Sequence, residues 1–300
     1  MRTTIANRFD ESLNAIQTHA RQVADEQSRL SSGTKLLRAS DSPIAIGRSV
    51  DLRTSSAHLD SLKRLQSAAL NRMSEAELAL ADAARALDDF HQLWASTSNG
   101  SLGPDQLVFF STQAKALQEE LRQTLMRTDS GGYRLFDKTS LLVTIGGGSN
   151  NVDPISVDTV GAIADLRVLN PNLGPEWLSE SDSLDAAIDK ITTDPESLIG
   201  KFVRSLQMGE RPVVPNQEFK TASRTMVLER IGVGANQARV ERATERANDV
   251  QLATQTALAV EVDTDYASSS MEVQKAKALL EAAQTITAQI GSMNLFQKLG

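Results

Sequence analysis

The chain contains no cysteine, and this absence removes several kinds of chemistry at once. Without thiols it can hold no thiolate nucleophile, no zinc–thiolate centre and no disulfide. The same absence suits a cytosolic protein and a protein that is exported unfolded through a narrow channel. The lack of cysteine therefore excludes thiol chemistry but does not indicate the cellular location of the protein.

Aromatic residues are also scarce. Only 4% of the residues are aromatic, although 40% are hydrophobic, so the apolar material is mostly Ala, Leu, Val and Ile. These residues suit the narrow seams between paired helices. The net charge is −7, and Lys and Arg do not gather on any predicted helix face. Binding to the phosphate backbone of nucleic acid is therefore not expected.

Long hydrophobic runs are missing as well. No stretch approaches the roughly 18 consecutive apolar residues that indicate a transmembrane helix, and residues 1–4 lack the apolar segment of a cleaved signal peptide. We expect neither membrane insertion nor a general secretory signal.

The polar residues show no arrangement typical of an active site. The three histidines, His19, His58 and His91, are far apart and have no second ligand at metal-binding spacing. The glycines at 146–148 are not followed by the Lys-Ser/Thr pair of a phosphate loop, which favours a hairpin turn. Asp263 and Asp265 would diverge on a helix. We predict no catalytic residue, metal ligand, cofactor or small-molecule substrate.

What the chain does contain is a heptad pattern at both ends. Apolar residues alternate at spacings of three and four, which places them on one helix face. At the C-terminal end these residues are Ala276, Leu279, Ala283, Ile286, Ile290 and Met293. At the N-terminal end they are Phe9, Leu13, Ile16, Ala20, Val23 and Leu30, with the polar Gln27 between the last two. Each face requires a partner helix.

A third stripe runs from Leu52 to Trp94, and no Gly or Pro occurs in residues 48–99. A continuous helix of that length would be roughly 75 Å long. Ser40 or Asp41 is placed to cap it, with Pro43 in its first turn. After a break at 99–104, a helix returns from Asp105. Another long helix is expected from Ala235 to Ile290, which contains no Gly or Pro.

The middle of the chain differs in composition. Residues 131–215 hold nine of the 17 glycines and six of the eight prolines. Short strands are predicted at 141–145 and 155–157, and short helices at 182–191 and 195–207. The predicted fold is therefore mainly α: a long antiparallel helical bundle or coiled coil formed by both termini, with a small mixed α+β insertion domain.

Five segments follow from this pattern. We interpret residues 1–45 as an N-terminal coiled-coil segment for export and assembly, and residues 261–300 as its C-terminal assembly counterpart. Residues 46–130 and 216–260 are the two halves of the helical bundle, and residues 131–215 are the outer insertion domain.

Two short motifs add a family resemblance. Leu30, Ser31, Ser32 and Gly33, followed by Ser40, Asp41 and Pro43, resemble the "LSSG…SDDP" signature of the bacterial flagellin superfamily. Asp263, Asp265, Tyr266 and Ala267 resemble its "D-x-D-[YF]-A" motif, which opens the last helix. The resemblance covers about residues 1–136 and 225–300.

Within that superfamily the chain is most similar to the hook–filament junction proteins, the third class of hook-associated proteins. The similar segments are the opening Met1-Arg2, ASTSNGSL at 95–102, GGYRLF at 131–136 and the closing Asn294-Leu295-Phe296. The chain departs from the superfamily pattern at Ser42, which replaces the usual second Asp, and from the junction pattern at Asp137-Lys138. A flagellin is therefore the alternative.

The resemblance implies a structural role in the flagellum. The paired termini would line the inner tube, and the insertion would face outward. Type III export would place the protein outside the cell, at the distal end of the hook. The implied partners are flagellin, a neighbouring hook-associated protein, further copies of the chain in a ring, and an export chaperone.

Eight residues are the candidates for assembly contacts: Leu13, Ile16, Val23, Leu30, Leu279, Ile286, Ile290 and Met293. The same faces could instead form the core of an intramolecular bundle, because knobs-into-holes packing is identical within and between chains. A cytosolic coiled-coil scaffold would explain the heptads but not the two motifs.

Overall fold

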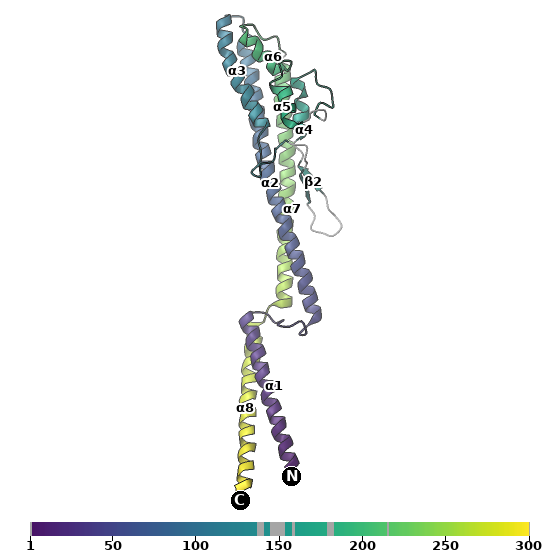
Figure 1. Cartoon of the computed structure of the whole chain (residues 1–300), viewed down its shortest axis with the longest axis vertical. Coiled ribbons are helices and arrows are strands. Elements are labelled where there is room, and N and C mark those ends of the chain that lie inside the picture. The colour runs from purple at the N-terminus through teal and green to yellow at the C-terminus, as the bar shows by residue number, and fades with distance from the viewer. Residues whose placement is uncertain are drawn as a thin grey trace. The chain divides into compact units, whose positions relative to one another are not determined.

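The computed structural model describes residues 2–136, 141–144, 154–157, 160–178, 183–214 and 216–299. Side-chain surroundings are described for 10–136, 163–178, 183–214 and 216–289. Two compact units are present (Figure 1): a terminal unit, Met1–His58 with Asp249–Gly300, and a bundle unit, Leu59–Asn248.

The described part of the chain is mainly helical, as predicted. Its long helices are α1 (Arg2–Ser32), α2 (Pro43–Thr97), α3 (Pro104–Leu125), α7 (Gln217–Val262) and α8 (Tyr266–Leu299). Shorter elements lie between α3 and α7: β1 (Leu141–Thr144), β2 (Pro154–Val157), α4 (Val160–Asp165), the 3₁₀ helix η1 (Leu166–Leu169), α5 (Leu184–Thr192) and α6 (Leu198–Gln207).

The core of the bundle unit confirms the stripe predicted on α2. From Leu59 to Phe90 every apolar position of that stripe is buried. Its one polar member in this stretch, Gln66, is fully buried and accepts a hydrogen bond of 3.1 Å from the Thr244 hydroxyl on α7. A buried amide oxygen needs such a donor, because burial without one is unfavourable.

Three phenylalanines join α2, α6 and α7. Phe90 and Phe219 stack with ring centroids 5.7 Å apart, and Phe202 meets both rings edge-on at 6.2 and 6.0 Å. These offset and edge-on arrangements are the favourable ones for aromatic pairs. Three of the chain's aromatic residues thus pack together where these three elements meet.

The elements between α4 and α6 pack into the same core. Ile163, Trp177, Ile188 and Phe202 belong to one buried cluster with residues of α2, α3 and α7. The helices α5 and α6 agree with the predicted ones. The interpretation of 131–215 as an outer insertion domain, and the five-segment division, stay predictions.

β1 and β2 form an antiparallel pair in which Leu141 is opposite Val157 and Thr144 opposite Pro154. Proline suits this terminal position because it has no N–H to donate to a sheet. The glycines predicted to form the turn, 146–148, lie outside the described residues.

Two local expectations are wrong. The helix predicted from Ala235 to Ile290 is broken at 263–265, although no Gly or Pro occurs there. The cap of α2 is also neither Ser40 nor Asp41: the Ser42 hydroxyl accepts a hydrogen bond of 3.3 Å from the Ala45 N–H. Ser and Asp are equivalent N-caps, so Ser42 performs locally what an Asp at this position would do.

Among the residues that the structure describes, no helix is both long enough and apolar enough to cross a membrane.

Candidate assembly site

The first and last helices pair within the terminal unit. α1 and α8 lie antiparallel, with the two chain ends at the same end of the pair (Figure 1). The pair is held by a narrow seam in which Ile, Val and Leu alternate with small and polar residues. On α1 the half-buried positions include Ser12, Ile16, His19, Val23, Glu26 and Leu30, and on α8 the buried or half-buried ones include Val273, Ala276, Leu280, Ala283 and Thr287.

The predicted assembly residues fall into two groups. Ile16, Val23 and Leu30 are half-buried in the seam. Leu13, Leu279 and Ile286 remain 39%, 42% and 53% exposed. Ile290 and Met293 lie on α8, outside the residues whose side chains are described.

The division has a simple geometric cause. The predicted α1 stripe pairs position 16 with 13 and 20, whereas the observed seam pairs it with 12 and 19. On α8 the seam takes Leu280 in place of Leu279, and Thr287 in place of Ile286. A one-residue shift rotates a helix by about 100°. Large apolar side chains of α8 are thereby left outside the seam of the single chain.

The two motifs meet at the base of this pair. Gly33 follows the last residue of α1 with φ +70°, and its N–H donates to the Arg29 carbonyl at 2.9 Å. This is a helix ending in a left-handed residue, where glycine avoids the strain of a Cβ. The Gly33 carbonyl in turn accepts a 3.0 Å hydrogen bond from the N–H of Thr264. The motif at 30–33 therefore bonds directly to the motif at 263–267.

Asp265 starts α8. Its Oδ1 accepts hydrogen bonds from the N–H groups of Ala267 and Ser268, at 3.0 and 3.3 Å. An aspartate cap suits a helix N-terminus because it satisfies otherwise unpaired donors and opposes the positive end of the helix dipole. Next to it, a Cβ added to Gly33 would lie 3.0 Å from the Tyr266 hydroxyl oxygen. The positive φ at position 33 thus favours glycine, and the Tyr266 hydroxyl leaves little room for a Cβ there.

Lys35 is a contributor that sequence reasoning missed. Its N–H donates to the Val262 carbonyl at 2.8 Å, and its ammonium donates to the Val260 carbonyl at 2.6 Å. The last turn of α7 has no basic residue of its own, so Lys35 supplies the positive charge that a helix C-terminus favours. The lack of a basic residue in the last turn of α7 is the sequence signal that could have indicated a basic partner from elsewhere in the chain.

Asp41 holds the connection between α1 and α2. Its Oδ2 accepts hydrogen bonds from the backbone N–H groups of Leu37 and Arg38, both at 3.0 Å. The hydrogen bond from Arg38 is the main reason that the pKa of Asp41 lies below its ordinary value. Ser40 forms no described hydrogen bond, and Pro43 takes the first position of α2.

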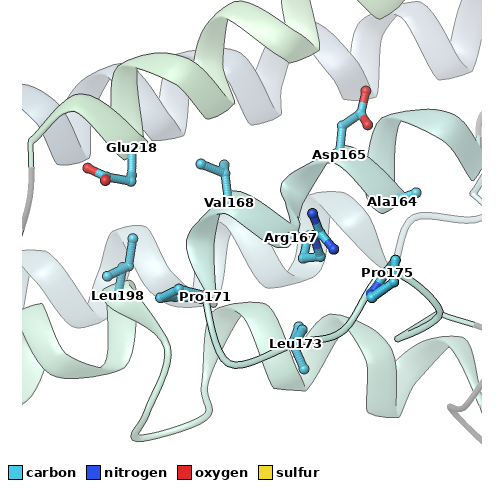
Figure 2. Close-up of a pocket in the computed structure, with 9 residues that line it drawn as sticks. All are labelled: Ala164, Asp165, Arg167, Val168, Pro171, Leu173, Pro175, Leu198 and Glu218. Atoms are coloured by element: carbon cyan, nitrogen blue, oxygen red, sulfur yellow. The ribbon is translucent and has the colours of Figure 1, made fainter.

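A surface cavity in the bundle unit is an alternative candidate site. It measures about 740 Å³, and in Figure 2 Glu218 lies on the far side of Val168 from Arg167 and Asp165. Its described lining contains no histidine, serine or threonine that could act as a nucleophile or base. In the described part of the chain no group of acidic residues and histidines could hold a metal ion.

Comparison with known proteins identifies the paired helices. Residues 7–140 match the bacterial flagellin N-terminal helical region, and residues 217–299 match the bacterial flagellin C-terminal helical region. The chain carries both helical regions of bacterial flagellin. The two flagellin regions contain α1 from residue 7 onward and all of α8, as well as both motifs that meet at their base.

Two relatives extend this match. A flagellin of Halalkalibacterium halodurans is 23% identical over 261 residues, which cover 87% of this chain and 85% of that protein. A solved structure from Vibrio parahaemolyticus, of a protein assigned as flagellar hook-associated, shares the fold with a TM-score of 0.54. It is 10% identical and covers 74% of this flagellin-family chain and 99% of its own.

The flagellin family consists of structural proteins, which are exported and assemble with other subunits of the extracellular flagellum. The chain is therefore a flagellar structural protein.

Proposed function

We propose that the protein is an adaptor at the junction between the hook and the filament. Its paired terminal helices would be built into the axial structure of the flagellum, at the distal end of the hook. Its neighbours would be flagellin on one side and another hook-associated protein on the other, with further copies of the chain in a ring.

The observation that supports an assembly role is the exposed apolar line beside the α1–α8 seam. Leu279 and Ile286 lie one heptad apart on α8 and are about half exposed in the single chain. Full burial of such a side chain contributes about 1.5–3 kcal/mol, so covering the exposed half of each against a neighbour contributes about half of that. The seam alone buries little, so the pair gains most of its stability when a neighbouring subunit covers this line.

The choice of junction over filament rests on local likenesses. The segments at 95–102, 131–136 and 294–296 resemble junction proteins, and a protein assigned as hook-associated shares the fold. An adaptor presents different surfaces to its two neighbours, whereas a filament subunit must be complementary to itself. Export through the type III apparatus, and the chaperone that would accompany it, belong to the same proposal.

A filament subunit is the second candidate. The relation to a flagellin over 87% of the chain favours it.

Immunogold labelling of sheared flagella separates the two candidates. We expect one band at the distal end of the hook, and cells without the gene should keep hooks while releasing flagellin into the medium. Label along the whole filament would identify a filament subunit. So would long filaments grown by the purified protein alone from sheared filament fragments.

A further inference from the structure

A turn in the bundle unit that is held by several hydrogen bonds exposes the side chain of Tyr133 to solvent. Tyr133 is 70% exposed. The turn that carries it closes with hydrogen bonds between the backbones of Asp129 and Tyr133 (2.8 Å) and of Leu135 and Arg127 (3.1 Å). The Asp129 carboxylate also accepts from the N–H groups of Gly131 and Tyr133, both at 2.9 Å.

Two arginines anchor this turn to the helices beside it. Arg72 of α2 binds the Asp129 carboxylate at 3.3 Å and the Arg134 carbonyl at 2.9 Å. Arg134 in turn binds Asp185 of α5 at 2.9 Å and the Met126 carbonyl. Arg72 and Asp129 are nearly buried, with 12% and 11% of their side chains exposed. The turn is therefore rigid before any partner arrives.

The ring of Tyr133 packs against Gly131 in the same turn. A Cβ added to Gly131 would lie 3.2 Å from Cδ2 and 3.4 Å from Cε2 of the ring, so one edge of the ring rests against the glycine. In the described part of the chain no aromatic or basic side chain stacks on the ring. Fixed, exposed aromatic side chains are the groups that most often anchor protein interfaces.

The charged residues around the turn indicate which kind of side chain would bind at the ring. Asp129 and Asp185 each have an arginine partner, but Glu75 has no basic partner among the described residues. Glu75 is held at the turn by a 3.3 Å hydrogen bond from the N–H of Ser130. Among the described residues, the Glu75 carboxylate therefore has no basic partner at the turn that carries the exposed ring. A carboxylate and an aromatic face presented by one turn suit a cation.

We propose that Tyr133 and Glu75 form a receptor for a basic side chain, Arg or Lys, of a neighbouring flagellar subunit. The cation lies over the aromatic ring and pairs with the carboxylate. This contact rests on the proposed function, because it requires a neighbour in the assembly, and it lies outside the terminal helices. It adds a specific, salt-sensitive contact to the apolar ones of α8.

Four variants test the receptor, with the fraction of protein incorporated into flagella as the measurement. Tyr133→Phe keeps the ring and should incorporate within about twofold of the wild type. Tyr133→Leu keeps apolar bulk without an aromatic ring, and should lose about three- to tenfold, as a cation–π contact of ordinary strength requires. Tyr133→Ala should lose at least as much.

Glu75→Gln is the matched electrostatic variant, since its amide oxygen can still accept from the Ser130 N–H. It should lose about threefold and should become less sensitive to salt than the wild type. Unchanged circular dichroism and thermal unfolding of all four monomers would confirm that the turn still folds. A variant that unfolds is replaced by crosslinking from position 133.

For crosslinking, Tyr133 is replaced by photoreactive benzoylphenylalanine in the assembled protein. Capture of a neighbouring subunit within reach of an Arg or Lys supports the proposal. Capture of a surface without one, purely intrachain products, or wild-type incorporation of Tyr133→Leu would overturn it. In each of these cases the adaptor role stands if the wild-type protein labels only the distal end of the hook. Absence of the wild-type protein from flagella would contradict both the receptor and the adaptor function.

Discussion

The terminal unit and the bundle unit use the same kinds of helix and bury very different amounts of apolar surface. In the bundle unit large side chains such as Phe90, Phe202 and Met73 are completely buried. In the described part of the terminal unit, the buried apolar side chains are only Val262, Val273 and Ala276, each 6–8% exposed.

This difference indicates how each unit becomes stable. Ordering one residue costs about 1–2 kcal/mol in backbone entropy, while each buried methylene returns about 0.8 kcal/mol. The bundle unit can meet that cost with its own core. The terminal unit has a mostly half-buried seam, and Leu279 and Ile286 lie outside it, so we expect it to depend on neighbouring subunits.

The strongest test places charge on the exposed line of the terminal unit. Replacing both Leu279 and Ile286 by Asp should abolish incorporation, because each unpaired charge in a buried contact costs several kcal/mol. The unfolding temperature of the bundle unit should not change, since neither position lies in it. Incorporation is measured by labelling flagella. The matched control places Asp at the exposed polar positions Gln274 and Gln284; normal motility of the Leu279/Ile286 variant would show that this face makes no assembly contact.

The bundle unit should show the opposite behaviour. Phe219→Ala removes the ring that stacks on Phe90, and should lower the free energy of unfolding by about 3–5 kcal/mol. Chemical denaturation of the purified monomer measures this loss. Phe109→Ala, at a position that is 76% exposed, should change it by less than about 0.5 kcal/mol. Similar losses in both variants would contradict the central role of the aromatic cluster.

A smaller effect is expected where the two motifs meet. Gly33→Ala should open the base of the α1–α8 pair by about 1–2 kcal/mol, because alanine is strained at positive φ. Hydrogen exchange at the amides of Lys35 and Thr264 should then accelerate about five- to thirtyfold. Adding Tyr266→Phe removes the hydroxyl that crowds position 33 and should recover part of the loss. An unchanged exchange rate in Gly33→Ala would mean that the motifs do not lock each other.

The smallest effect concerns Asp41 and pH. Because its pKa is lower in the folded chain than the ordinary 3.8, its contribution is complete above that value and disappears as the pH falls through the folded pKa. The amides of Leu37 and Arg38 should keep their NMR shifts from pH 7 to pH 5 and change only below about 3.8. Asp41→Asn should remove this transition. A transition near neutral pH would contradict the assignment.

Much of the fold could be predicted from residue patterns. The stripe on α2 gave the buried face of the bundle, since an apolar heptad permits only one inward face. The helices α5 and α6 were predicted close to their observed bounds. The residue pattern did not predict the break at 263–265, although the family motif there implies the start of a helix. The break depends on backbone hydrogen bonds to residues 33 and 35, which are more than 200 positions away.

The candidate site divides in the same way. The sequence by itself determined that α1 and α8 carry apolar faces that need partners, and which short motifs flank them. Only the tertiary structure decided which residues enter the seam and which stay outside it. The physical reason is that positions such as 279 and 280 are both apolar, and the rotation of one helix against the other selects between them. The roles of Lys35 and Thr264 likewise arise only once the chain has brought its two ends together.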